Sequence, residues 1–216
     1  MMQLLVKAVL SYLLGSIVGS LLIRRLVGGP DIRSLGSGNA GATNALRTLG
    51  KKVAFTVLVI DVAKGWIATA LIAPRTLPGF ASDAVAIQAW VAPACGIAVM
   101  LGHVYPIWYG LRGGKGMATL VGAVLGLSVR LLVPMLLAFL ITVMLFGFVG
   151  LGSMVSVLAL VITMALEHRG APLMLFAILA LALICYTHRS NIARMREGTE
   201  HRARRLWLFG LRREPS

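Results

Sequence analysis

The chain has 216 residues, of which 58% are hydrophobic and only 13% are charged, yet its formal net charge is +14. Soluble domains carry about a quarter charged residues, so this composition excludes an ordinary soluble domain, and its apolar content excludes a disordered chain. A nucleic-acid-binding domain is also disfavoured, because the basic residues lie between long apolar runs. The composition predicts an all-α, polytopic membrane protein. Its positive charge is interpreted first as a signal of how the chain is oriented in the membrane.

Seven apolar runs have lengths near the roughly 20 residues that cross a bilayer as a helix. Two of them are short, so between five and seven crossings are expected, with seven preferred. The expected helices cover residues 3–23, 53–73, 84–102, 116–129, 131–149, 154–166 and 171–187, the short ones being 116–129 and 154–166.

Lys and Arg are unevenly divided between the two sets of connections. With the N-terminus outside, the inside connections 24–52, 103–115, 150–153 and 188–216 hold sixteen of them, and the outside connections hold only Arg75, Arg130 and Arg169. Because basic residues are retained on the cytoplasmic side, we expect the N-terminus outside and the C-terminus inside. This topology brings every polar, Gly-rich segment to the cytoplasmic side.

The first polar segment is residues 35–47, LGSGNAGATNALR. Its glycines allow backbone N–H groups to approach a ligand closely, and its neutral side chains add donors and acceptors. Arg47 adds a planar guanidinium suited to phosphate. Residues 42–49 are expected to form a short helix whose N-terminus faces the loop. The candidate ligand-binding residues are Ser37, Gly38, Asn39, Gly41, Thr43, Asn44 and Arg47.

The second segment is residues 102–119, in which Gly113, Gly114, Lys115 and Gly116 resemble a phosphate-binding turn that leads into a helix. The spacing differs from a Walker A loop, so nucleotide hydrolysis is not implied. We expect an anion to be bound by Lys115, the glycine amides and the helix start. His103, at the start of the segment, is more typical of a hydrogen-bonded residue than of a catalyst.

The third segment, residues 188–200, follows the last apolar run. On a helix, His188 and Asn191 share a face, and His188 can act as a base, an acid or a phosphate donor. Glu200 is expected to restrain basic side chains. In the connection 150–153, Ser153 is expected to donate a hydrogen bond to phosphate.

Asp61 and Lys64 lie within an apolar run, where charges are costly and usually paired, so an ion pair that supports the site is expected. No metal-binding cluster and no Ser-His-Asp spacing are apparent. We divide the chain into a membrane domain, 1–200, and a basic amphipathic tail, 201–216, expected to form an interfacial helix.

Three blocks, SGNAGATNALRTLGKK (37–52), GHVYPIWYGLRGGKGMAT (102–119) and HRSNIARMREGTE (188–200), together resemble the acyl-phosphate-dependent glycerol-3-phosphate acyltransferases of bacteria, the PlsY family. The resemblance implies a seven-helix enzyme of the bacterial inner membrane with a cytoplasmic active site. The implied reaction transfers an acyl group from acyl phosphate to the sn-1 hydroxyl of glycerol 3-phosphate. The products are 1-acylglycerol 3-phosphate and inorganic phosphate, in the first acylation step of phospholipid synthesis.

The resemblance also assigns roles by position. The catalytic residues would be Ser37, Arg47, Lys115, His188 and Asn191; the phosphate-binding residues would be Gly38, Asn39, Gly41, Thr43, Asn44, Gly113, Gly114, Gly116, Ser153 and Glu200. No cofactor, metal or nucleic acid is implied. The partners are the two substrates and membrane lipids. The general base is either His188 or a phosphate oxygen of the substrate.

This sequence departs from the family pattern at two places. Ala40 stands where the family commonly has Pro, and Leu111-Arg112 replaces an aromatic-Lys pair. The alternative function is a small organic-phosphate transporter, which would also use charges and Gly turns within a membrane. A lipid phosphotransferase of the CDP-alcohol type is disfavoured, because that chemistry needs clustered aspartates and this chain has three that lie far apart.

Overall fold

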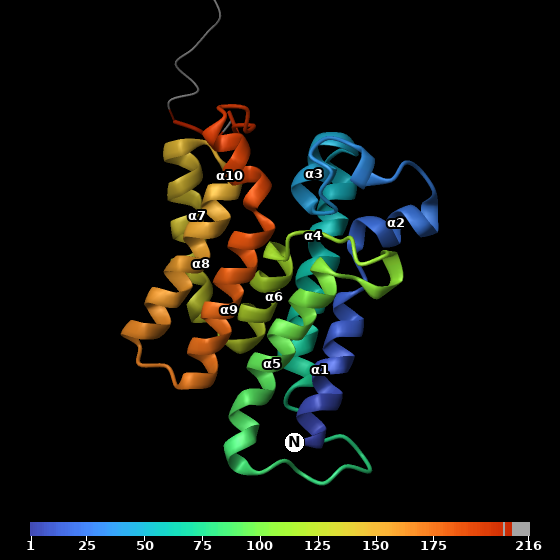
Figure 1. Ribbon diagram of the computed structural model, residues 1–216, viewed down its shortest axis with the longest axis vertical. Helices are drawn as coiled ribbons and strands as arrows, with labels where there is room; N and C mark the ends of the chain where they lie inside the picture. Colours follow the sequence, from blue (N-terminus) through green and yellow to red (C-terminus); the bar gives the residue numbers. More distant parts are fainter. Residues whose placement is uncertain (205, 209–216) are drawn as a thin grey trace, which may run out of the picture. The chain divides into compact units, whose positions relative to one another are not determined.

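The structure, a computed structural model, describes residues 1–204 and 206–208, and every regular element in that range is a helix (Figure 1). The all-α prediction is therefore confirmed. The chain divides into two compact units, Met1–Val129 and Arg130–Ser216. Each unit carries part of the predicted site and is described by itself.

The first unit contains six α-helices joined by short irregular helices. In chain order they are α1 (Met2–Gly15), α2 (Gly19–Val27), the 3₁₀ turn η1 (Ile32–Ser34), α3 (Ala42–Thr48), α4 (Lys51–Trp66), the π-helix η2 (Ile67–Ile72), α5 (Val85–Val104), the 3₁₀ turn η3 (Ile107–Tyr109) and α6 (Met117–Leu127). The predicted short helix at residues 42–49 is confirmed as α3.

Close approach of backbones through glycine joins α1 to α5 and α4 to α6. A Cβ on Gly102 of α5 would lie 2.1 Å from the carbonyl oxygen of Tyr12, and one on Gly122 of α6 would lie 1.9 Å from that of Val62. Small residues drive helix association in membranes in this way, because apolar side chains gain little from leaving lipid. These contacts fix the relative positions of the helices that carry the two polar loops of this unit.

The prediction of one continuous helix over residues 3–23 was wrong. Helix α1 ends at Gly15, α2 begins at Gly19, and the two axes differ by 54°. Lys64 of α4 donates to the carbonyl oxygens of Gly15 and Ile17, at 2.9 and 2.8 Å. These contacts satisfy carbonyls that the break removes from the helical ladder. The break thus depends on a side chain from another helix, which local hydropathy does not register.

The second unit begins with the 3₁₀ turn η4 (Val129–Leu131), whose first residue still belongs to the first unit. Four helices follow: α7 (Leu132–Phe146), α8 (Val149–Leu166), α9 (Ala171–Thr187) and α10 (Arg189–Arg196). The last apolar helix coincides with its predicted range, 171–187.

The run 154–166 is not a short helix, and residues 150–153 are not a connection. They belong to α8, which starts at Val149. The glycines that suggested a turn instead allow close packing: a Cβ on Gly150 would lie 3.0 Å from Asn191 of α10, and one on Gly152 would lie 2.9 Å from Val143 of α7. Tertiary packing therefore overrides the low helix propensity of glycine here.

The predicted tail helix is also not found in the part of the tail that is described. Residues 201–204 and 206–208 are irregular, with turns at 204, 206 and 208, and residues 205 and 209–216 lie outside the described range. The backbone N–H of Ala203 donates to Gly147, and the indole of Trp207 donates to Leu145 at 3.1 Å. The tail thus caps carbonyl groups at the end of α7.

Four helical stretches of the described chain are long and apolar enough to cross a membrane, and up to six are if each bent pair counts as one span. They are Lys51–Ile72, Val85–Tyr109, Val129–Phe146 and Val149–Leu166, with the bent pairs α1–α2 and α9–α10. Helix α6 is apolar but has only 11 residues. A multi-pass membrane protein is confirmed, and seven crossings remain a prediction.

Candidate active site

Asn44, in the first turn of α3, organises the first polar segment. Its side-chain nitrogen donates to the carbonyl oxygens of Ile32, Leu35 and Asn39 at 2.9–3.2 Å, and its Oδ1 accepts from the backbone N–H of Ser37 at 3.0 Å. The residue is only 1% exposed. The side-chain amide of Asn44 therefore shapes the loop from inside, and its predicted contact with phosphate stays a prediction.

The other candidates of this segment lie nearer the surface. Ser37, Gly38, Thr43 and Arg47 are exposed, whereas Asn39 and Gly41 are half-buried. Thr43 and Arg47 are one helical turn apart on α3, so they share a face. This face carries a hydroxyl and a guanidinium, and phosphate binding by the two residues stays a prediction.

The second segment forms a loop between α5 and α6. Lys115 is half-buried, and Gly116 has a φ of +89° at the N-cap of α6. The N–H groups of Gly113 and Gly114 donate to the carbonyl oxygens of Val104 and His103, at 3.0 and 3.1 Å. These two amides therefore have acceptors within the protein, and anion binding by this turn stays a prediction.

Steric limits explain why both positions are glycine. A Cβ on Gly113 would lie 1.9 Å from the carbonyl oxygen of His103, and one on Gly114 would lie 2.2 Å from Nε2 of the same residue. The two glycines let the loop fold back on the end of α5. The loop backbone in front of Lys115 is thereby held against His103.

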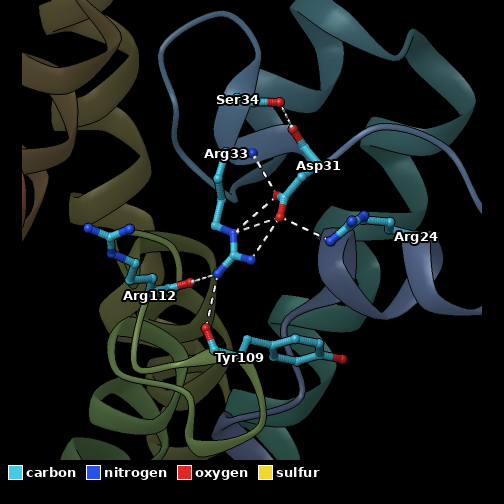
Figure 2. Close-up of polar contacts among 6 residues, drawn as sticks. All are labelled: Arg24, Asp31, Arg33, Ser34, Tyr109 and Arg112. Atoms are coloured by element: carbon cyan, nitrogen blue, oxygen red, sulfur yellow. Dashed lines mark hydrogen bonds and ion pairs between the residues drawn. The ribbon is translucent and has the colours of Figure 1, made fainter.

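Arg33, which lies just before the first polar segment and was not among the predicted site residues, ties the two polar segments together (Figure 2). Its Nη1 donates to the carbonyl oxygens of Tyr109 and Arg112, at 3.0 and 3.1 Å, while Nε and Nη2 bind the carboxylate of Asp31. Arg24 of α2 joins the same carboxylate at 3.0 Å. The Asp-x-Arg spacing just before the Gly-rich loop is the sequence feature from which Arg33 could have been predicted. In the first unit, the predicted segments that carry Arg47 and Lys115 are thus joined.

The ion pair between Asp31 and Arg33 makes the stability of this connection depend on pH. Hydrogen bonding from Arg33 is the largest influence on the Asp31 carboxyl and lowers its pKa from 3.8 to about 2. A carboxyl with a lowered folded-state pKa stabilises the fold above its unfolded pKa, and this contribution is lost as the pH falls toward the folded pKa. The shift sets an upper limit of about 2 kcal/mol, reduced by solvent and salt screening because the side chain is partly exposed.

We therefore expect Asp31→Asn to melt at a lower temperature than wild type at about pH 6, and the two melting curves to converge as the pH falls from about 4 to about 2. Thermal unfolding in detergent at several pH values measures this. Glu167→Gln, which alters an exposed ion pair with Arg169 in the other unit, serves as the control. A melting difference that stays constant over the whole range would contradict the assignment.

In the second unit, His188 lies at the junction of α9 and α10. Its Nδ1 is 2.8 Å from the carbonyl oxygen of Ile184, and since a carbonyl only accepts, Nδ1 carries the proton. The Nε2 atom of the neutral ring then has a lone pair that can accept a proton or a hydrogen bond. The geometry is compatible with the predicted role as base.

Asn191 and Glu200 are bound to each other. The Asn191 amide donates to Oε1 of Glu200 at 2.7 Å, and Arg194 donates to Oε2 at 2.6 Å. Both carboxylate oxygens are therefore paired, and a carboxylate repels phosphate, so Glu200 restrains its neighbours rather than binding the ligand. Ser153 donates its hydroxyl proton to the carbonyl oxygen of Val149 at 3.0 Å, and its predicted hydrogen bond to phosphate stays a prediction.

Replacing Glu200 should reduce activity through Asn191. For Glu200→Ala we expect kcat/KM to fall about 10- to 100-fold, because a charge-assisted hydrogen bond contributes about 1.5–3 kcal/mol. Glu200→Gln keeps one acceptor and should retain more activity than alanine. Steady-state acylation assays measure both, and Glu197→Ala, at the end of α10, is the control. Equal loss in the alanine and glutamine variants would contradict a positioning role.

The fold and these groups define an integral membrane protein with cationic and neutral donors suited to phosphate. Within the described residues, no group of His, Cys, Asp or Glu is arranged to hold a metal ion. The predicted Asp61–Lys64 ion pair is present, with the charged atoms 3.0 Å apart.

Comparison with known proteins identifies the class. The family model for glycerol-3-phosphate acyltransferase matches residues 5–198, and the chain belongs to this family. It is 39% identical over 191 residues to the glycerol-3-phosphate acyltransferase of Geotalea daltonii, covering 88% of this chain and 93% of that protein. The enzyme of the same name from Brucella anthropi is 38% identical over 194 residues, covering 89% of each.

The fold is also similar to solved structures. Two crystal structures of PlsY, an integral membrane glycerol 3-phosphate acyltransferase, match with 34% and 33% identity and TM-scores of 0.82 and 0.80. Each match covers 92% of this chain and 94% of the other. One is described as the glycerol 3-phosphate form and the other as the lysophosphatidic acid form. The chain is an acyltransferase of this family, which confirms the predicted resemblance and excludes the transporter alternative.

Proposed function

We propose that this glycerol-3-phosphate acyltransferase uses acyl phosphate as its donor and releases inorganic phosphate. The acceptor is the sn-1 hydroxyl of glycerol 3-phosphate, and the product is 1-acylglycerol 3-phosphate. The reaction takes place at the cytoplasmic face of the bacterial inner membrane, with the N-terminus outside.

The observation that supports two phosphate-bearing substrates is the connection made by Arg33. It ties the loop before α3, which carries Thr43 and Arg47 on one face, to the loop that presents Lys115. Guanidinium and ammonium groups with neutral donors around them suit phosphate oxygens. Ser37, Gly38, Asn39, Gly41 and Gly116 complete the phosphate-binding set that we propose for this unit.

The chemistry requires little covalent help from the protein. The hydroxyl oxygen of glycerol 3-phosphate attacks the acyl carbonyl carbon, and the carbon–oxygen bond to phosphate breaks as phosphate leaves with its electron pair. Phosphate is a good leaving group, so holding the two substrates in line and screening their negative charges supplies much of the acceleration. Arg47 and Lys115 would serve this screening.

The proton of the attacking hydroxyl passes either to Nε2 of His188 or to a phosphate oxygen of the substrate. The hydrogen bond from Nδ1 of His188 to Ile184 supports the first route, since it places the ring proton on Nδ1 and the lone pair on Nε2. The pH profile of kcat/KM for His188→Gln separates the two routes: an unchanged profile and rate would exclude His188 as the base. Asn191 would orient the reacting groups.

The proposed sidedness is supported by the first unit. Its N-terminus and the 73–84 loop lie at one end, where Asp83 binds the terminal amine and the N–H of Leu4. The two polar segments lie at the other end, near α2 and α3 (Figure 1). Labelling of single cysteines placed at Ala81 and at Thr43 in intact spheroplasts tests the sidedness: only the first should react with an impermeant reagent.

The donor is tested with purified protein in lipid nanodiscs. Palmitoyl phosphate plus glycerol 3-phosphate should yield equal amounts of inorganic phosphate and lysophosphatidic acid, whereas palmitoyl coenzyme A should yield no product. Arg47→Ala and Lys115→Met should lose most activity. Turnover with the coenzyme A thioester and none with the acyl phosphate would overturn the proposed donor.

A further inference from the structure

Three buried ionisable side chains that the proposed reaction does not use meet between α4 and α5. Asp61, Lys64 and His103 are 1%, 3% and 2% exposed. The Lys64 Nζ lies 3.0 Å from Oδ1 of Asp61 and 2.8 Å from Nδ1 of His103, and this Nδ1 lies 3.4 Å from Oδ1 of Asp61. Buried charges of this kind are retained when they are paired and hydrogen-bonded.

The contacts of His103 with Asp61 and Lys64 orient the imidazole. Its Nδ1 lies 2.8 Å from the Lys64 ammonium and 3.4 Å from the Asp61 carboxylate, so this edge of the ring faces the charged pair of α4. The opposite edge, which carries Nε2, is directed to the Gly loop.

The other side of His103 supports that loop. The Cα of Gly114 packs so close to the ring that a Cβ there would lie 2.2 Å from Nε2. The carbonyl oxygen of His103 accepts the N–H of Gly114, and the carbonyl of Val104 accepts that of Gly113. Both main-chain and side-chain atoms of His103 therefore set the position of the turn that precedes Lys115.

The same ion pair also secures the break between α1 and α2. Lys64 binds the carbonyls of Gly15 and Ile17, and Asp61 accepts the N–H of Gly19 at 3.2 Å. A cation at a helix C-terminus and an anion at a helix N-terminus both match the helix dipoles.

Side chains at the two ends of this break reach both polar loops. From α1, the Tyr12 hydroxyl donates to the carbonyl of Tyr105 at 2.8 Å. From α2, the Ser20 hydroxyl donates to the carbonyl of Ala40 at 2.7 Å. The buried ion pair thus holds the two helices, α1 and α2, whose side chains bind the two polar loops.

We propose that Asp61, Lys64 and His103 form a positioning network that seats the Gly113–Gly116 turn and so sets the affinity for glycerol 3-phosphate. This inference depends on the proposed function only in that Lys115 binds phosphate. None of the three side chains needs to touch the substrate. Substitutions of Lys64 and His103 should then have non-additive effects on the affinity for glycerol 3-phosphate.

The test is a double-mutant cycle on the binding of glycerol 3-phosphate, measured by isothermal titration calorimetry with no acyl donor present. His103→Phe keeps a ring beside Gly114 but removes the nitrogen that contacts Lys64, and Lys64→Met removes the ammonium group. Each single variant should raise Kd about tenfold, since a hydrogen bond to a charged group is lost, and the double variant should be no weaker than the weaker single one. His103→Asn, which keeps an acceptor near the position of Nδ1, should bind more tightly than His103→Phe.

Thr69→Val is the matched control. The Thr69 hydroxyl is buried in the same unit and bonds the carbonyls of Gly65 and Ala123, away from both loops. This variant should lower the melting temperature without changing Kd, which separates positioning from a general loss of stability.

Effects of Lys64→Met and His103→Phe that multiply in the double variant would overturn the proposal, as would an unchanged Kd in both single variants. If Lys64→Met does not fold, the proposal is tested by comparing the Kd values of His103→Asn and His103→Phe for glycerol 3-phosphate. Equal values would overturn the proposal. Since no donor is present, failure of the acyl-phosphate assay leaves this binding result intact.

Discussion

Gly113→Ala is expected to reduce kcat/KM by about 100-fold or more, because inserting a methyl group into a packed site displaces backbone as well as side chains. The new Cβ would lie 1.9 Å from the carbonyl oxygen of His103 and 2.8 Å from Cδ of Pro106. The first of these is main chain at the end of α5, so the loop itself must move. That movement would break the hydrogen bond from Gly113 to Val104 and displace Lys115.

Gly114→Ala should be less damaging than Gly113→Ala, though still severe. Its Cβ would meet a side-chain atom, Nε2 of His103, at 2.2 Å. A side chain yields more readily than backbone, but this ring is itself held by Lys64 at 2.8 Å. Steady-state kinetics with varied glycerol 3-phosphate, together with melting temperatures, measure both effects.

Gly170→Ala provides the control for these two substitutions. Gly170 is exposed at the N-cap of α9, and the nearest atom to its Cβ position is 3.7 Å away. It should therefore retain wild-type kinetics. Near-normal kcat/KM in Gly113→Ala would show that the loop is not seated against His103 as described.

The second large effect is expected at Asn44. Asn44→Ala removes the donor to three carbonyl oxygens and the acceptor of the Ser37 N–H. Buried groups left without partners cost about 1–3 kcal/mol each, so the loop before α3 should lose its conformation and activity should fall by about 100-fold or more. The loss should appear in kcat/KM although the side chain is not exposed to substrate.

Asn44→Asp separates hydrogen bonding from packing. The carboxylate has the same shape, but it cannot donate and would repel the carbonyl oxygens that the amide nitrogen now contacts. We expect it to be as damaging as alanine. Thr56→Val, which removes an exposed intrahelical hydrogen bond in α4, is the control for loss of a side-chain bond. Wild-type activity in Asn44→Asp would contradict the assigned role.

The sequence predicted the elements whose signals are local. The helix at residues 171–187 is an uninterrupted apolar run, and α3 follows a Gly-rich loop, so both were found with nearly correct limits. The Asp61–Lys64 pair was also found, because two charges three residues apart in an apolar helix have few ways to be satisfied.

The errors have a common physical origin, in that contacts distant in sequence decided the local structure. The break after Gly15 depends on Lys64, and the helical start of α8 depends on close packing of Gly150 and Gly152. The hydrogen bonds of the Gly113 and Gly114 amides could not be predicted either. Their acceptors, the carbonyl oxygens of Val104 and His103, become near neighbours only when the chain folds back.

The high apolar content and the net charge of +14 determined a multi-pass all-α membrane protein, and three polar blocks determined its family. These properties depend on residue type and order alone, since partition into lipid and recognition of phosphate are carried by side-chain chemistry. Tertiary structure alone decided which polar groups face a ligand and which hold the scaffold. Asn44 became a support, and Arg33 a clamp, because a buried donor must find acceptors wherever the fold brings carbonyl groups near.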